Sequence, residues 1–194
     1  MPDPLTIDRA RTAVLVMDFQ AGIVERIPEP GRLLELTAGV LTGARAAGLL
    51  VIYVVVGFRA GYPEASSRNQ AFGAIRESGR MLLDAPDTVV HASVAPRPGE
   101  ATVVKHRVNA FHGTDLEVLL RAGNRDALIL MGISTSGVVL STVRHAADAD
   151  YRLVVVRDCC ADPDAEVHEC LMSKVFPRQA TVTGSADLLR ALGA

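Results

Sequence analysis

Six short apolar runs recur along the chain, and polar or mixed segments separate them. They cover residues 13–17, 50–56, 101–105, 127–131, 152–156 and 179–183. Their hydrophobicity is continuous rather than alternating, which is typical of strands that are covered on both faces of a sheet. The pattern therefore predicts six buried strands.

Helical patterns lie between most of these runs. Residues 31–47 carry apolar side chains at helical spacing, and Gly48 follows as a stop signal. Thr114 and Glu117 have the spacing of a capping box before the next helix, and Ser136 is placed to cap a helix that runs through the residues after it. The alternation predicts one three-layer α/β/α domain over residues 1–194, with a six-stranded, mostly parallel sheet and right-handed crossovers.

The segment 57–98 interrupts this alternation. It contains several Gly and Pro residues, one short helical pattern at 71–77 and little strand character. Connections of this length usually act as lids or binding surfaces. We therefore expect this segment to contribute to a functional site or to contacts between subunits.

Composition and charge exclude several classes of protein. The formal net charge is -2, and the charged residues are scattered, so no basic stripe is available to bind nucleic acid. No apolar run approaches the roughly 18 residues of a membrane span, and the N-terminal residues lack the apolar centre of a signal peptide. The sequence predicts a cytoplasmic protein with no membrane or nucleic-acid partner. The odd number of cysteines, Cys159, Cys160 and Cys170, predicts reduced thiols rather than a disulfide framework.

The candidate chemistry lies at the carboxyl ends of the predicted strands, where open parallel sheets bind ligands. Asp18 ends the first strand, Lys105 ends the third, and the small-residue turn 132–138 follows the fourth. Such a strand–turn–helix junction directs backbone N–H groups at one spot, where an anion or a developing oxyanion can be held. We predict that the acid, the cation and the turn meet at one edge of the sheet.

Three motifs carry a family resemblance. They are D-x-Q at Asp18 and Gln20, Lys105 followed by N-A-F-x-x-T-D-L at 109–116, and G-I-S-T-S-G-V-V-L-S-T at 132–142. Over residues 10–185 the chain closely resembles the isochorismatase-like hydrolases, a superfamily that includes nicotinamidases and related cysteine amidohydrolases. In most members the resemblance implies an Asp–Lys–Cys triad, in which the Cys attacks an amide carbonyl while the Asp shuttles its proton.

Two members of that triad carry over as Asp18 and Lys105, but the cysteine position falls on Val138, which has no nucleophilic group. The resemblance also implies a cis peptide bond between Ile133 and Ser134. It further implies a turn whose amides hold the oxyanion, formed here by Ile133, Ser134, Gly137 and Val138.

True isochorismatases of the family also lack the cysteine, have glycine in its place, and cleave a vinyl ether by acid catalysis with the Asp and water. By this precedent we expect a hydrolase of a small, carboxylate-bearing molecule, with Asp18 as acid and base and Lys105 as its electrostatic partner. A neighbouring cation lowers the pKa of Asp18 and burial raises it, so acid catalysis requires burial to dominate.

Two alternatives remain open. The replacement at Val138 favours a catalytically silent member that binds a small ligand or serves as an oligomeric regulatory protein. An amidohydrolase with a relocated nucleophile would need one of four other residues, although the serines miss the nucleophile-elbow spacing and the cysteines have the character of packing residues. These four are Ser134, Ser136, Cys159 and Cys160.

The substrate pocket is expected to contain aromatic and cationic side chains near the strand ends. Arg59 and Arg68 are candidate anchors for a carboxylate, because guanidinium binds carboxylates in a bidentate manner. Other candidate substrate-binding residues are Phe19, Gln20, Phe58, Tyr62 and Phe111, and His106 and His112 flank the lysine segment. Nicotinamidases place an Asp and several His after the second strand, which this chain lacks, so we predict no metal and no cofactor. The resemblance implies a homodimer or homotetramer.

Overall fold

The computed structural model describes residues 5–193, which form a single α/β domain around one sheet. The sheet has the strand order β3-β2-β1-β4-β5-β6 and is parallel throughout, where the sequence predicted a mostly parallel sheet. Its strands are β1 (Thr12–Met17), β2 (Leu50–Val56), β3 (Ala101–Lys105), β4 (Ala127–Ile133), β5 (Arg152–Ala161) and β6 (Thr181–Thr183).

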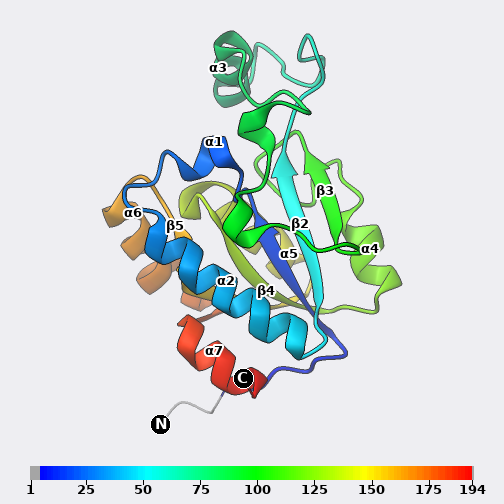
Figure 1. Ribbon diagram of the computed structural model, residues 1–194, viewed down its shortest axis with the longest axis vertical. Helices are drawn as coiled ribbons and strands as arrows, with labels where there is room; N and C mark the ends of the chain where they lie inside the picture. The colour runs from blue at the N-terminus through cyan, green and yellow to red at the C-terminus, as the bar shows by residue number, and fades with distance from the viewer. Residues whose placement is uncertain (1–4, 194) are drawn as a thin grey trace.

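Helices cover both faces of the sheet (Figure 1). They are α1 (Ala21–Val24), α2 (Gly31–Ala46), α3 (Gln70–Ser78), α4 (Leu116–Ala122), α5 (Leu140–Asp148), α6 (Ala165–Cys170) and α7 (Ser185–Leu192). The shorter helical turns are η1 (Pro86–Thr88), η2 (Ala92–Val94), η3 (Thr135–Val139), η4 (Leu171–Val175) and η5 (Phe176–Arg178). The three-layer α/β/α architecture expected from the sequence is therefore present.

The two layers of the core follow from the alternation of side chains along β1. Ala13, Leu15 and Met17 are fully buried in the cluster that includes the apolar faces of α4 and α5. Val14 and Val16 point the other way, into the cluster formed with α2 and α7. Because every residue of β1 is buried, this strand is the centre of the domain.

Most predicted elements lie within a few residues of the observed ones, but β5 is longer than its apolar run. It continues to Ala161, although the apolar run ends at Val156. The polar interruption includes Asp158, whose carboxylate accepts hydrogen bonds from the backbone N–H (2.8 Å) and the hydroxyl (2.7 Å) of Ser185 at the start of α7. The last residues of the strand, Cys160 and Ala161, pair with Gly132 and Ile133 of β4.

Both predicted helix caps are wrong. The hydroxyl oxygen of Thr114 accepts from the N–H of Leu116 at 3.3 Å and not from that of Glu117, and the Glu117 carboxylate pairs with Arg121 rather than closing a capping box. Ser136 lies inside the wide turn η3, for which Ser134 is the N-cap residue. Its backbone N–H instead donates to the carboxylate of Asp162 at 2.7 Å.

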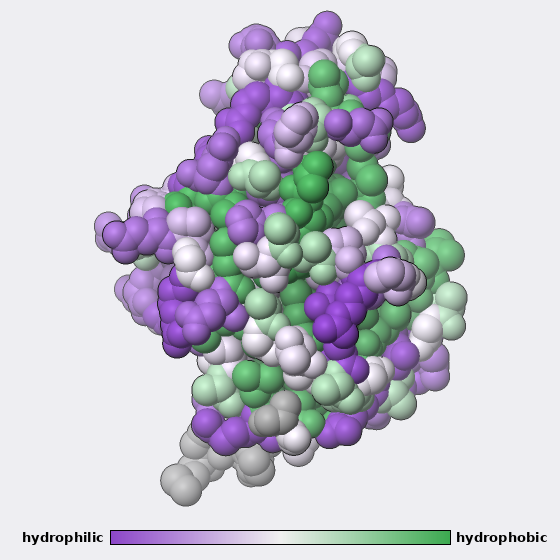
Figure 2. All heavy atoms as spheres, viewed as in Figure 1, coloured by the Kyte–Doolittle hydropathy of each residue, from purple (hydrophilic) through white to green (hydrophobic). Residues whose placement is uncertain are grey.

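The long segment after β2 forms a protrusion beyond the carboxyl ends of the strands, with α3 at its outer part (Figure 1). It has a small core of its own, in which Phe58, Tyr62, Phe72 and Met81 are buried. On the face shown in Figure 2, hydrophobic residues gather below this protrusion and hydrophilic residues dominate its edges. The segment therefore covers the end of the sheet where the candidate residues lie.

Candidate active site

The site lies where the strand order reverses. From β1 the chain moves outward through β2 and β3, and then returns to place β4 on the other side of β1. Such a reversal opens a crevice beyond the carboxyl ends of the two central strands. Asp18 follows β1 directly with a positive φ of 58°, a conformation that Asp adopts more readily than most residues. The turn η3 follows β4, so both segments border the same crevice.

Asp18 and Lys105 form a buried ion pair at this crevice. Lys105 Nζ lies 2.8 Å from Asp18 Oδ2, and the two side chains are only 3% and 7% exposed. Lys105 Nζ also donates to the carbonyl of Arg107 at 3.1 Å. Within residues 5–193, Asp18 Oδ1 is buried and has no hydrogen-bond partner. One carboxylate oxygen is therefore held by the lysine, and the other remains available to a ligand.

Burial controls the protonation of Asp18. Desolvation raises the pKa of its carboxyl, and the charge and hydrogen bond of Lys105 lower it without cancelling the effect of burial. The net direction is upward, as a general acid requires. Asp18 can therefore hold a proton at a higher pH than an exposed aspartate.

A cavity of about 270 Å³ borders the Asp18–Lys105 pair. This volume lies just below the usual range for ligand pockets, which begins at roughly 300 Å³, so the occupant must be small. Apart from the pair, Arg26 and Ser134, the lining is mainly apolar, as the full set shows: Asp18, Ile23, Arg26, Ile27, Val56, Ala71, Phe72, Ile75, Lys105, Val108, Ile133, Ser134, Gly137, Val138 and Pro163.

The turn after β4 forms one wall of the cavity. The peptide bond between Ile133 and Ser134 is cis. A Cβ atom added to Gly137 would lie 2.6 Å from the hydroxyl oxygen of Ser134, so glycine permits this close approach. The hydroxyl of Thr135 shares a hydrogen bond of 2.8 Å with Nδ1 of His168, which ties the turn to α6. Val138 is buried and presents an apolar side chain to the cavity.

The aromatic residues expected at the substrate do not line this cavity. Phe19 is 1% exposed and belongs to the core formed with α2 and α7. Phe58 and Tyr62 pack inside the protrusion, where the Tyr62 hydroxyl donates to the carbonyl of Arg80 at 2.9 Å. Phe111 stacks on His145 with ring centres 4.6 Å apart. These aromatic rings therefore pack against other side chains of the domain and do not border the cavity.

The polar residues that were expected to bind the substrate also lie outside the cavity lining. The side chain of Gln20 donates to the carbonyls of Val56 (2.8 Å) and Thr88 (2.9 Å), and accepts from the N–H of Val56 (2.8 Å). The Gln20 side chain therefore links the end of β2 to the protrusion through these hydrogen bonds. Arg59 is 69% exposed and pairs with Glu64 at 3.0 Å, and Arg68 is exposed and does not line the cavity.

Residues of α1 and the turn after it were missed by the sequence reasoning. Ile23, Arg26 and Ile27 line the cavity from this side. A helix of only four residues gives no periodic signal, so no sequence pattern marked them. Arg26 is exposed, and no carboxylate of residues 5–193 lies within ion-pair distance of its side chain.

The candidate replacement nucleophiles differ in position. Ser134 lines the cavity, whereas Ser136, Cys159 and Cys160 do not. Burial raises the pKa of the Cys159 thiol to about 12 and moves the pKa of Cys160 upward as well. Both thiols are therefore protonated near neutral pH, where a nucleophilic cysteine must ionise.

Two further observations concern the described part of the chain. None of its helices combines the length and the apolar character that crossing a bilayer requires. Residues 5–193 contain no group of three or more His, Cys, Asp or Glu side chains arranged to hold a metal ion. His106 does not border the cavity, because its Nδ1 lies 2.6 Å from the carbonyl of Gly57, and His112 is exposed.

Together, the fold and site define a parallel α/β/α domain with a buried acid–lysine pair at the strand-order reversal. Residues 12–187 match the family model described as Isochorismatase domain. The chain belongs to the isochorismatase family of hydrolases.

Relatives and solved structures of this family match nearly the whole chain. The uncharacterized isochorismatase family protein YecD of Escherichia coli O157:H7 is 32% identical over 97% of this chain and all of its own length. The ureidoacrylate amidohydrolase RutB of Caulobacter vibrioides is 30% identical, over 84% of this chain and 83% of RutB. The structure of an isochorismatase family protein from Burkholderia thailandensis has a TM-score of 0.84 and 26% identity, covering 99% of this chain and 100% of that one.

Proposed function

We propose that this protein hydrolyses a small, carboxylate-bearing molecule by acid–base chemistry of Asp18, with Lys105 as electrostatic partner and without a cysteine nucleophile. The observation that carries the proposal is the state of Asp18. Its carboxyl is buried beside a small cavity, its pKa is raised, and one oxygen has no partner within the described residues. A proton held there has few acceptors other than a molecule in the cavity.

The reaction that fits this arrangement best is hydrolysis of a vinyl ether. Protonated Asp18 donates its proton to the terminal vinyl carbon, and the neighbouring carbon and ether oxygen share the resulting positive charge. Water then adds to that carbon and returns a proton to Asp18, and the hemiketal breaks into a ketone and an alcohol. Lys105 stabilises the carboxylate that Asp18 becomes after the first step, because its ammonium group lies 2.8 Å away.

The residues around the cavity argue against a thiol mechanism. Val138 supplies no nucleophile, and the two cysteines of β5 are buried, protonated and outside the cavity lining. A relative named for the hydrolysis of ureidoacrylate supports a substrate that carries a carboxylate. We propose that the backbone amides of the turn, at Ile133, Ser134, Gly137 and Val138, help to hold negative charge on the ligand.

Isochorismate, a vinyl ether with carboxylate groups, is the probe for a direct test. The purified protein should convert it to a ketone and an alcohol, and Asp18→Asn should abolish that conversion. Asp150→Asn is a matched control, since Asp150 is exposed and has a similar positive φ of 63°. Iodoacetamide should leave the rate unchanged. Turnover that survives Asp18→Asn, or that thiol alkylation stops, would contradict the mechanism.

One observation favours a second candidate, a catalytically silent member that binds its ligand without turnover. Val138 is 2% exposed and occupies the part of the wall where the family resemblance implies a nucleophile. Val138→Cys separates the two candidates. Gain of ureidoacrylate hydrolysis by this variant, with no turnover of either compound by the unmodified protein, would favour the silent candidate.

A further inference from the structure

The cavity has an uneven distribution of charge. Lys105 and Asp18 are bound to each other at one side, and the walls formed by α3 and β2 are apolar. Arg26 is the remaining charged residue of the lining, and it comes from the turn that follows α1. A ligand that fills the cavity therefore meets an acid–base pair and a separate guanidinium.

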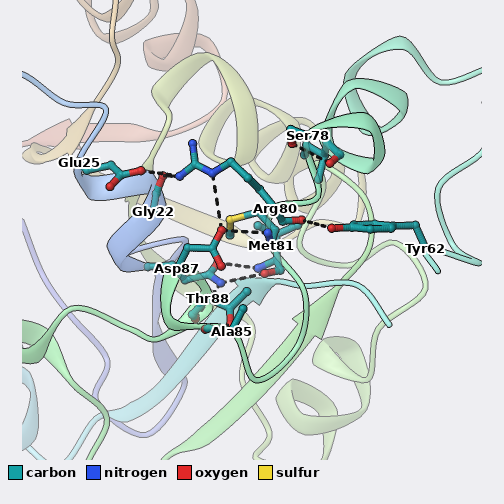
Figure 3. Close-up of polar contacts among 12 residues, drawn as sticks. Gly22, Glu25, Tyr62, Ser78, Arg80, Met81, Ala85, Asp87 and Thr88 are labelled. Atoms are coloured by element: carbon teal, nitrogen blue, oxygen red, sulfur yellow. Dashed lines mark hydrogen bonds and ion pairs between the residues drawn. The ribbon is translucent and has the colours of Figure 1, made fainter. Parts of the chain in front are cut away.

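Arg26 forms no ion pair with any carboxylate of residues 5–193. Glu25, the residue next to it, pairs with Arg80 from the protrusion (Figure 3). Arg80 also donates to the carbonyl of Gly22 at 3.0 Å and lies 3.6 Å from the carboxylate of Asp87. The nearest carboxylate in the sequence is thus already engaged, and Arg26 has no ion pair within residues 5–193. A ligand carboxylate would be its partner.

The same contacts hold the backbone that carries Arg26. A Cβ atom on Gly22 would lie 2.7 Å from Cβ of Asp87, so α1 packs tightly against the protrusion. The N–H of Ala21 donates to the carbonyl of Val89 at 2.8 Å, and the N–H of Arg26 donates to the carbonyl of Ile23 at 3.1 Å. Arg26 therefore lines the cavity from a turn whose backbone is held in place.

We propose that Arg26 binds a carboxylate of the substrate, and that a short apolar body separates this carboxylate from the reacting group. The proposal rests on the proposed function for the identity of the reacting end. Two observations point to this ligand: a cation without a protein partner at one place in the lining, and the unpartnered, buried oxygen of Asp18 at another. Guanidinium suits a carboxylate because its planar N–H groups match the two oxygens.

Binding of crotonate, compared with its neutral counterpart crotonamide, tests this assignment without any turnover. NMR titration of the unmodified protein should give tighter binding of crotonate by about tenfold, the size expected for charge-assisted hydrogen bonds at a partly exposed site. Arg26→Gln should remove this preference and leave crotonamide binding unchanged. Arg26→Lys should retain part of it, because the charge remains but the planar fork is lost.

Arg68→Gln is the matched control, since Arg68 is also exposed but does not line the cavity. It should leave the crotonate preference intact. The proposal is overturned if the unmodified protein does not prefer crotonate, if Arg26→Gln retains the preference, or if Arg68→Gln removes it. Retention in Arg26→Gln would place the carboxylate at Lys105 or at the turn amides. These outcomes do not depend on catalysis. The proposed function is tested separately, and it fails if turnover survives Asp18→Asn.

Discussion

Replacement of Lys105 by methionine tests the energetic role of the buried ion pair. Methionine keeps most of the apolar stem of lysine and removes the charge, so the packing around β3 changes little. Asp18 then remains 5% exposed with no cation beside it. Removing one partner of a buried ion pair typically costs about 3–5 kcal/mol, because the other charge is left without compensation. In a domain of this size each kcal/mol lowers Tm by about 2–4 °C, so a decrease of about 6–20 °C is expected.

The loss of stability should depend on pH, and the sign follows from the pKa of Asp18. Burial already raises this pKa and Lys105 opposes the rise, so the variant has an Asp18 pKa that is raised further. A carboxyl with a raised pKa in the folded state retains a proton that the unfolded chain releases above about pH 4. The contribution of this protonated carboxyl to the free energy of unfolding is fully present below about pH 4. It is lost as the pH rises from there through the folded-state pKa of Asp18. The difference between the two proteins should therefore grow with pH.

Urea unfolding followed by circular dichroism at about pH 5 and about pH 8 measures this difference. Lys174→Met serves as the control, since Lys174 is the other lysine of the sequence and is exposed. Its stability should match that of the unmodified protein at both pH values. A loss in Lys105→Met that is below about 1 kcal/mol, the scale of exposed pairs, would refute the reasoning. So would a loss that is equal at the two pH values.

Two further predictions concern packing and thiol chemistry. Gly22→Ala places a Cβ atom 2.7 Å from Asp87 and should destabilise the protein by about 1–3 kcal/mol in urea unfolding, whereas Gly39→Ala in α2, which meets open space, should be neutral or slightly stabilising. Equal effects of the two substitutions would refute the close contact. Ellman's reagent should titrate one thiol, that of exposed Cys170, in the folded protein and three after unfolding, because the two cysteines of β5 are buried and protonated. Reaction of a second thiol before unfolding would contradict this burial.

The sheet could be predicted from the sequence because burial on both faces leaves a continuous apolar run. β1 is the clearest case, with six buried residues in succession. The apolar run alone does not show the full length of β5, since the strand continues through Asp158, whose carboxylate accepts from Ser185 in a distant helix. The capping box fails for a local reason, because Asp115 and not Thr114 is the N-cap residue of α4, and the Thr114 hydroxyl oxygen accepts from the N–H of Leu116 instead of Glu117.

The site was predictable only in part, for a comparable physical reason. The proximity of Asp18 and Lys105 follows from the ends of two parallel strands, which sheet topology brings to one edge. The state of an arginine depends instead on which carboxylates lie near it in space. Arg59 is engaged by Glu64, whereas Arg26 lacks an ion-pair partner among residues 5–193 and the adjacent Glu25 pairs with Arg80 of the protrusion. No local pattern distinguishes these two arginines.

The pairing of β1 with β4 also has a consequence for the order of events during synthesis of the protein. Met17 lies beside Gly132 in the sheet, so the acid and the turn meet only after most of the chain has been made. Pairing over such a separation is slow compared with the formation of local structure. A ligand that needs both segments binds the completed fold and not its shorter precursors, and so stabilises only the native state. Protection by that ligand against proteolysis would therefore report that β1 and β4 have paired.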